Sequence, residues 1–588
     1  MRNLLLAALL GAALTACDGG STPPPPPPTK LAFEVQPTPA TAGVAIAPAV
    51  RVVVQDASGN TVTSGSFSVT VALSNNTSGA TLSGTTTRTT VAGVATFSDL
   101  TIDKVGTGYT LTVTAATLTS ATSSAFGVTP GAPSKLAYLI QPTAAEGAQP
   151  ISPAIRVVIQ DAHANTVTTA TNTVTLQLGE NPGSASLLDA ASSSAVDGVA
   201  TFSNVRIDRP GTGYTLIASA GSLGSATSAP FNVTLTFASI SAGGTFPSSG
   251  HSCGVTRAGA AYCWGANAFG QLGNGTTVEE IRPTLVSRTL SFISVSAGSN
   301  HTCGVTTDRA AYCWGANSKG QLGDGTTSNR TSPTAVGGGS SFAIVSAGDL
   351  YSCGVTTTGT AQCWGYNGDG QLGDGTTADR TTPALVDGSL VFFNISADSA
   401  HTCGAATNGR GYCWGSGARG RLGDGTSTNR LTPSLVFGDL RFSNIVVGLD
   451  HSCGLTLSGM THCWGAGDNG QLGNGSTADS PTPSEVLGGR TYNSIGAGWY
   501  HNCATREGEA ADCWGYNANH QLGDGTTTQR SVPGAVSGAI VFDRVDGARY
   551  HTCAVTRTGV AYCWGNNNHG QLGDGTRTQR ATPVRVIQ

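Results

Sequence analysis

Apolar and polar residues alternate in short runs along most of this chain, and glycine, asparagine and proline separate the runs. Alternation with a period of two places one face of each strand in a core and leaves the other face in solvent. After the first apolar segment the sequence shows neither helix caps nor heptads. The pattern therefore predicts an all-β protein with many short strands and tight turns.

The first of two internal repeats covers the N-terminal part of the chain. The segment Leu31–Pro37 returns 105 residues later as Leu136–Pro142. Each copy is about 100 residues of alternating runs, which is typical of an antiparallel β-sandwich. Both copies place Gly-Thr-Gly before a tyrosine, Tyr109 or Tyr214, as in a tyrosine corner. We predict sandwiches at 31–130 and 131–235.

The second repeat has a period of 50 residues and continues from His251 to the C-terminus. Each copy opens on His-x-Cys or Tyr-x-Cys, places Cys-Trp-Gly ten residues after the first cysteine, and continues into a turn such as Gly320–Gly325. Copies of about 50 residues, each with four short strands, are typical of β-propellers. We therefore predict a seven-bladed β-propeller at 236–588.

Fourteen of the 15 cysteines form seven pairs whose members are ten residues apart. Zinc sites use closer spacings with further ligands nearby, so we interpret the pairs as disulfides, which indicate an oxidising compartment. Each pair faces across a hairpin of its own blade, and closing so short a loop is worth about 2–3 kcal/mol. The predicted disulfides are Cys253–Cys263, Cys303–Cys313, Cys353–Cys363, Cys403–Cys413, Cys453–Cys463, Cys503–Cys513 and Cys553–Cys563.

The order of strands also predicts how the ring closes. The chain stops at 583–588, a proline-led strand with nothing behind it, whereas the first copy begins at Phe237–Ile240 without such a strand. We expect the C-terminal strand to complete the first blade and so to remove both open edges.

The 50-residue copies resemble the RCC1 (regulator of chromosome condensation) repeat, whose pattern combines Ala-Gly, a His-Ser-like pair, Trp-Gly and a Gly-Gln-Leu-Gly turn. The resemblance spans 236–588 and implies a propeller. The 105-residue copies resemble bacterial Ig-like repeats of surface adhesins.

Leu14-Thr-Ala-Cys17 resembles the lipobox of bacterial lipoproteins, which implies that signal peptide 1–16 is removed and that Cys17 is lipidated. An ordinary secretory peptide ending in cysteine is the alternative.

Residues 17–30 contain six consecutive prolines, which form a semi-rigid spacer. Together with the lipobox this predicts an exported lipoprotein anchored at the cell envelope or cell surface. Asp18 resembles an inner-membrane retention signal of some enteric bacteria. With a net charge of −4 and no basic cluster, we expect no nucleic-acid partner and membrane contact only through the lipid. We also expect a monomer.

The recurrent histidines and tryptophans occur in nearly every blade, and so we interpret them as structural, the tryptophans as packing between blades. The Asp-Gly and Asn-Gly turns lack the spacing of an EF-hand and are interpreted as turn formers. No nucleophile elbow, phosphate-binding loop or metalloprotease motif is found. We expect no catalytic, metal or cofactor residue, and no enzyme.

Against this regular frame, loop tips on one face vary from blade to blade. Tryptophan, tyrosine and arginine are the residue types that dominate binding interfaces. The candidate binding face comprises Trp499, Tyr500, Arg549, Tyr550, Tyr516, Asn517, Tyr366 and Phe269.

We expect this face to bind a protein or a glycan, as an adhesion or interaction platform. Three alternatives remain: an inhibitor of an extracellular enzyme, a guanine-nucleotide exchange factor as in the founding member of the RCC1 family, and a propeller-based hydrolase or lyase. An exported domain does not meet a cytosolic GTPase, which counts against the exchange factor.

Overall fold

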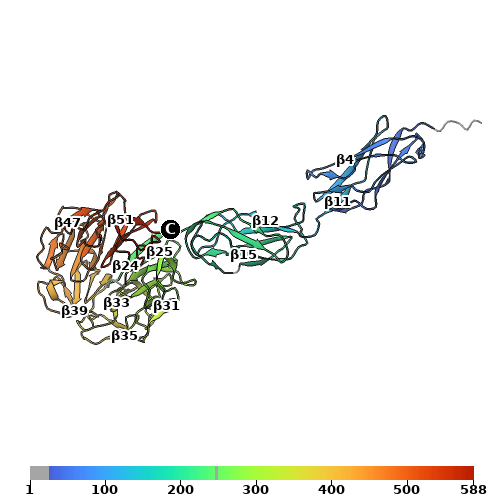
Figure 1. The fold of residues 1–588 in the computed structure, drawn as a ribbon. Helices are drawn as coiled ribbons and strands as arrows, with labels where there is room; N and C mark the ends of the chain where they lie inside the picture. The colour runs from blue at the N-terminus through green and yellow to red at the C-terminus, as the bar shows by residue number, and fades with distance from the viewer. Residues whose placement is uncertain (1–25, 190, 245–248) are drawn as a thin grey trace, which may run out of the picture.

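The computed structural model describes residues 26–189, 191–244 and 249–588. These residues form two elongated all-β units that follow one another and lead into a ring of small sheets (Figure 1). Within the described residues, helical structure is confined to the short turn η1 (Ala418–Gly420). The predicted signal peptide 1–16 and Cys17 lie outside the described residues.

The first unit has its own core between two main sheets, of order β1-β3-β7 and β2-β11-β9-β4-β6. Along β9, Tyr109, Leu111 and Val113 are buried whereas the threonines between them are half-exposed. This is the alternation that the sequence shows. Its strands are β1 (Lys30–Val35), β2 (Ala40–Thr41), β3 (Val50–Gln55), β4 (Ser68–Ser74), β5 (Leu82–Ser83), β6 (Thr87–Thr89), β7 (Val94–Phe97), β8 (Thr101–Ile102), β9 (Gly106–Thr114), β10 (Ala121–Thr122) and β11 (Phe126–Thr129).

The second unit repeats this arrangement around a separate core. In both units the tyrosine hydroxyl donates to a carbonyl five residues upstream, Tyr109 to Lys104 and Tyr214 to Arg209, each at 3.0 Å. This is the geometry of a tyrosine corner. Its strands are β12 (Lys135–Ile140), β13 (Ala145–Glu146), β14 (Ile155–Gln160), β15 (Thr173–Leu178), β16 (Leu187–Leu188), β17 (Ser192–Ser194), β18 (Val199–Phe202), β19 (Arg206–Ile207), β20 (Gly211–Tyr214), β21 (Leu216–Ser219), β22 (Ala226–Thr227) and β23 (Phe231–Thr234).

From residue 237 onward, the described residues form seven four-stranded antiparallel sheets in succession, here numbered sheets 1 to 7. The four strands of each sheet are consecutive in the chain and in the sheet. Sheets 1 to 4 contain β24 (Phe237–Gly243), β25 (His251–Thr256), β26 (Ala261–Gly265), β27 (Glu280–Leu285); β28 (Phe292–Ala297), β29 (His301–Thr306), β30 (Ala311–Gly315), β31 (Arg330–Ala335); β32 (Phe342–Ala347), β33 (Tyr351–Thr356), β34 (Ala361–Gly365), β35 (Arg380–Leu385); β36 (Phe392–Ala397), β37 (His401–Ala406), β38 (Gly411–Gly415) and β39 (Arg430–Leu435). Sheets 5 to 7 contain β40 (Phe442–Val447), β41 (His451–Thr456), β42 (Thr461–Gly465), β43 (Ser480–Glu485); β44 (Ser494–Ala497), β45 (His501–Thr505), β46 (Asp512–Gly515), β47 (Arg530–Ala535); β48 (Arg544–Gly547), β49 (His551–Val555), β50 (Ala561–Gly565) and β51 (Arg580–Arg585).

The prediction that the C-terminal strand completes the first sheet is wrong. β51 pairs with β50 of its own sheet, with Tyr562 opposite Arg585, and β27 fills the corresponding place in sheet 1. The reason is local. The loop after each third strand returns the chain to the free edge of the same sheet, as when Gly265 pairs with Glu280.

The ring closes instead through a loop of sheet 7 that lies on sheet 1. The indole Nε1 of Trp264 and the hydroxyl of Ser252 both donate to the carbonyl of Gln571, each at 2.9 Å. Gly575 N donates to Ile281 O at 3.0 Å. The same loop-to-next-sheet contacts recur around the ring, so closure needs no exchange of strands.

All seven predicted disulfides are present, each within one sheet. The paired cysteines lie opposite each other on the second and third strands, as Cys253 and Cys263 do, with Cα atoms 4.0–4.1 Å apart. The hairpin between them is as short as the sequence predicts.

The second unit is joined to sheet 1 by an ion pair and an apolar cluster. Arg209 contacts Glu280 through both guanidinium nitrogens, at 2.9 and 3.1 Å. Leu188 and Leu235 of the second unit belong to the same buried cluster as Tyr262 of β26. The second unit therefore contacts the ring at sheet 1 (Figure 1).

Candidate binding site at the mouth of the channel

A belt of side-chain hydrogen bonds joins neighbouring sheets around the channel, which is the space at the centre of the ring. In each sheet, the first residue of the second strand contacts the second residue of the equivalent strand in the following sheet. His301 Nε2, for example, lies 2.8 Å from Ser352 Oγ. Because Ser352 Oγ donates to Gln321 O, the hydroxyl must accept from the imidazole, and the proton is on Nε2. The belt pairs are His251–Thr302, His301–Ser352, Tyr351–Thr402, His401–Ser452, His451–Asn502, His501–Thr552 and His551–Ser252.

The belt histidines are fully buried and neutral at pH 7. Burial lowers the pKa of His251 and His451 to about 4 and that of His301, His501 and His551 to about 3. Their role is structural, as expected, and their partner is a side chain of the next sheet.

The tryptophans are packing residues, as predicted. Trp314 Nε1 donates to Gln271 O of the preceding sheet's Gly-Gln-Leu-Gly turn at 2.9 Å, and Leu272 of that turn is buried against the same ring. The last glycine, Gly273, has φ +69°, and a Cβ there would lie 2.6 Å from the indole nitrogen of Trp314. Only glycine fits this close approach.

The Asp-Gly turns stabilise their own loops. Asp324 accepts hydrogen bonds from the backbone and hydroxyl of Thr326 and forms an ion pair with Arg330 at 2.8 Å. Within residues 26–189, 191–244 and 249–588, no group of three or more His, Cys, Asp or Glu side chains is arranged to hold a metal ion.

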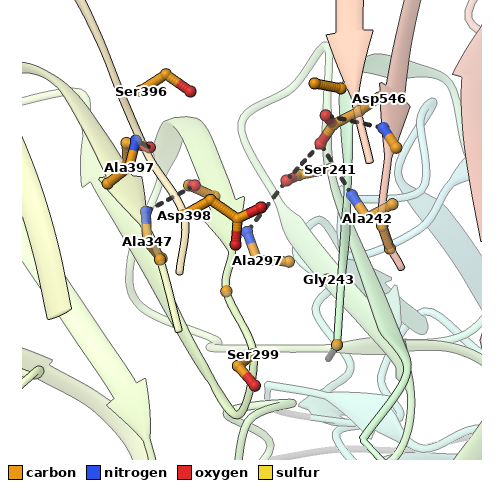
Figure 2. A pocket seen from close by; sticks show the side chains of 18 of the residues that line it. Ser241, Ala242, Gly243, Ala297, Ser299, Ala347, Ser396, Ala397, Asp398 and Asp546 are labelled. Carbon is orange, nitrogen blue, oxygen red and sulfur yellow. Dashed lines mark hydrogen bonds between the residues drawn. The ribbon is translucent and has the colours of Figure 1, made fainter. Parts of the chain in front are cut away.

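The first strands surround a central cavity of about 100 Å³. Serine hydroxyls accept a backbone N–H from the next sheet: Ser346 Oγ from Ala397 N at 2.9 Å is one example. At the seam between sheets 7 and 1 an aspartate takes this place. Asp546 Oδ2 accepts from Ser241 Oγ and Ala242 N, each at 3.0 Å (Figure 2). Burial raises the pKa of Asp546 to about 6.

The connections between first and second strands form one end of this cavity. We call residues 298–300, 348–350, 398–400, 448–450, 498–500 and 548–550 the channel mouth. Figure 2 shows Asp398 extending into the cavity. Its Oδ1 accepts a hydrogen bond from Trp499 Nε1 at 3.2 Å, so that the indole spans the mouth from two sheets away.

Five of the predicted face residues form one cluster at the mouth. Arg549 lies over the rings of Trp499 at 4.4 Å and Tyr550 at 4.7 Å. Tyr500 contacts Trp499 edge to face, with centroids 6.2 Å apart, and Tyr516 at 6.1 Å. Trp499 is only 9% exposed, so the expectation of an exposed indole is wrong. The tyrosines and Arg549 are partly exposed and form the accessible part of the cluster.

The other three predicted residues lie outside this cluster. Asn517 is fully buried; its amide holds the following loop through Asp524 Oδ1 at 3.1 Å, so its prediction as a face residue is wrong. A buried asparagine was mistaken for a surface residue because its loop partners are not visible in the sequence. Tyr366 is partly exposed under Lys319, 5.1 Å from its ring, and Phe269 is 41% exposed.

Three acidic residues at the mouth, Asp349, Asp398 and Asp450, were not predicted as site residues. Asp450 is bound by Arg421, which stands where most repeats have the glutamine of the Gly-Gln-Leu-Gly turn. Asp398 stands where five other sheets have glycine. These two departures from the repeat, at Arg421 and at Asp398, are the signal that could have identified Asp450 and Asp398.

The structure of the described part of the chain includes no helix long and apolar enough to cross a membrane.

Comparison with known proteins supports the repeat assignment. Two models described as "Regulator of chromosome condensation (RCC1) repeat" match the chain. One matches residues 258–305, 310–355, 408–455 and 458–505, and the other matches 237–271, 292–321, 342–371 and 547–571. No curated protein matches the sequence.

Solved structures show the same fold. Prp20p from Saccharomyces cerevisiae is 23% identical, with a TM-score of 0.50 over 56% of this chain and 85% of that chain. The same yeast RCC1 protein bound to Kap60 is 22% identical, with a TM-score of 0.50 over 56% and 83%. Human WBSCR16 is 21% identical, with a TM-score of 0.50 over 56% and 89%. The ring of sheets in the C-terminal half of this chain is therefore built from RCC1 repeats and has an RCC1-like propeller fold.

Proposed function

We propose that this protein is an exported, lipid-anchored surface protein whose seven-bladed propeller binds a partner protein at the channel mouth. In this proposal Cys17 carries the lipid, the proline-rich segment is a spacer, and two Ig-like domains hold the propeller away from the membrane. The seven disulfides support an oxidising environment.

The observation that carries the proposal is the aromatic and arginine cluster at the mouth. Tyr500, Tyr550 and Arg549 are partly exposed; Tyr500 and Arg549 contact the ring of Trp499, and Arg549 also lies over the ring of Tyr550. Preorganised tyrosine and arginine side chains give contact area at low entropic cost, and they dominate interface energetics. The ring of sheets holds these side chains in a fixed arrangement, which favours a binding role over a catalytic one.

A protein partner is favoured over a glycan by the solved relatives. Yeast RCC1 has been solved bound to Kap60, and the Prp20p structure was described together with its binding properties to Gsp1p and histones. These partners belong to those proteins; only the use of an RCC1 propeller for protein binding is carried over. We propose no catalytic activity.

The test compares three forms of the full chain as bait for surface and secreted proteins of the source organism. Tyr500→Ala should weaken capture of a specific partner by about 10-fold or more. Leu457→Ala is the matched control, because Leu457 is 69% exposed on the hairpin between the second and third strands of sheet 5. Equal capture by all three forms would move the site away from the mouth.

A further inference from the structure

The channel mouth has two chemically different sides. Sheets 6 and 7 contribute the aromatic and arginine cluster, whereas sheets 3 to 5 contribute Asp349, Asp398 and Asp450. Asp450 forms an ion pair with Arg421 at 2.5 Å. Among the described residues, no ion pair joins Asp398 to an arginine or lysine.

Asp398 occupies a position at which the fold favours the smallest residue. The equivalent glycines pack closely on the next sheet: a Cβ at Gly298 would lie 2.4 Å from Gly348 O, and one at Gly448 would lie 2.4 Å from Gly498 O. A side chain at this point therefore costs packing that the five glycine counterparts avoid. Such departures from the local rule concentrate at functional sites.

The surroundings of Asp398 are unfavourable to its charge. Burial and the like charges of Asp349, Asp450 and Asp546 raise the pKa of Asp398 well above its usual value, and the hydrogen bond from Trp499 offsets only part of this. A cation placed beside Asp398 would offset both the desolvation cost of its carboxylate and the repulsion from the neighbouring aspartates.

The size of the cavity limits what can enter. The cavity of about 100 Å³ has room for several water molecules. A folded loop cannot enter such a space, but the end of one unbranched side chain can. Lysine combines a compact ammonium with a flexible apolar stem, whereas the planar guanidinium of arginine is wider.

We propose that the mouth receives a lysine side chain of the partner protein, with its ammonium paired to Asp398 and its stem lying against Trp499 and Tyr500. This inference rests on the proposed function and names what the site recognises. The aromatic side supplies contact area, and the carboxylate supplies selectivity for a basic residue over a neutral one of similar length.

The experiment measures retention of peptide mixtures by the immobilised full chain. The probes are acetylated, amidated hexapeptide mixtures in which one central position is fixed as Lys, Arg, norleucine or Glu. The variants are Asp398→Asn, Asp398→Gly, Tyr500→Ala and the control Asp439→Asn, whose carboxylate is exposed and paired with Arg410. Asp398→Gly restores the residue of five other sheets and should fold.

The unmodified chain and Asp439→Asn should retain the Lys mixture at least 10-fold better than norleucine, and both Asp398 variants should lose this preference. Equal retention of Lys and norleucine that still depends on Tyr500 would overturn the lysine inference and leave the proposed function standing. Retention that is absent, or unaffected by Tyr500→Ala, would contradict both. Calorimetric binding of CaCl₂ alone, lost in Asp398→Asn, would show a metal site in place of the lysine site.

Discussion

Asp398 and the belt histidines show how single residues depart from, or maintain, the repeating frame. Position 398 is glycine in most sheets because the backbone of the next sheet approaches it closely. The belt position is histidine in six of seven sheets because one imidazole nitrogen can reach the next sheet's hydroxyl without a charge. Burial disfavours the charged form of both residue types. At neutral pH this costs stability at Asp398, because a carboxyl group is normally charged there, but not at the histidines, which are neutral.

Replacement of Asp398 by glycine should stabilise the propeller. The folded-state pKa of Asp398 lies above its unfolded value, so ionisation at pH 7–8 destabilises the native state, and the variant should gain about 1 kcal/mol or more. The gain should shrink as the pH falls and Asp398 becomes protonated. The measurement is the urea midpoint of the propeller transition, with Asp439→Asn as control. A lower midpoint for Asp398→Gly would contradict the unfavourable environment inferred here.

The propeller should be sensitive to acid. Burial lowers the folded-state pKa of five belt histidines to about 3 to 4 and that of His401 well below its usual value, whereas the unfolded value is about 6.5. Their stabilisation is therefore complete above pH 6.5 and is lost as the pH falls, by about 1.4 kcal/mol per pH unit for each histidine. The carboxyl groups whose folded-state pKa is raised, Asp208, Asp349, Asp398 and Asp546, act in the opposite direction, but the six histidines outweigh them.

The matched variant is His501→Tyr, since the chain already has a tyrosine at the equivalent position 351. It should reduce the loss of stability between pH 6.5 and 4.5 by about one histidine's share. Urea unfolding at several pH values measures this, and an unchanged pH dependence would show that the belt does not control acid stability.

At the level of elements, the repeating unit is a four-stranded sheet held by one disulfide between its second and third strands. The hairpin and its cysteines followed from sequence spacing, because their contacts are made within about ten residues. The packing of the tryptophan followed because this residue recurs in every copy. The seam did not follow. An unpaired terminal strand suggested strand exchange, whereas Asp546 and the loop after β50 make the contacts with sheet 1.

Removal of one disulfide tests the contribution of the hairpin. The double variant Cys403→Ser/Cys413→Ser should lose about 3 kcal/mol, the chain-entropy value for so short a loop. The measurement is the urea midpoint under oxidising conditions. Under fully reducing conditions the unmodified chain and the variant should converge, which serves as the control. Equal midpoints under oxidising conditions would show that the sheets do not need this bond.

At the level of the whole molecule, the second unit and the propeller are joined where sheet 1 departs from the repeat. Glu280 stands where five other sheets have an arginine, and it pairs with Arg209 instead of an aspartate of its own loop. Tyr262 is fully buried by this contact. The joint therefore combines an ion pair with buried apolar area.

Charge reversal should loosen this joint. Glu280→Arg places two guanidinium groups together, so the second unit should move more freely and the small-angle X-ray scattering profile should indicate a broader distribution of shapes. Glu485→Arg is the control, because Glu485 is exposed on the equivalent fourth strand of sheet 5. Identical profiles for both variants would show that the apolar cluster alone holds the joint.

The sequence by itself determined the strand content, the two repeats, the disulfide pairs and the structural roles of the tryptophans and histidines. These properties depend on local alternation and on spacings that recur in every copy. Only the tertiary structure decided that Trp499 lies over the cavity, that Asn517 is buried, that Asp398 faces Trp499 and that Asp546 closes the seam. The contacts of Asp398 with Trp499 and of Asp546 with Ser241 join residues about 100 to 300 positions apart, and their geometry depends on how the sheets are arranged around the channel. The contacts of Asn517 lie within its own loop, and only the folded conformation of that loop buries the amide.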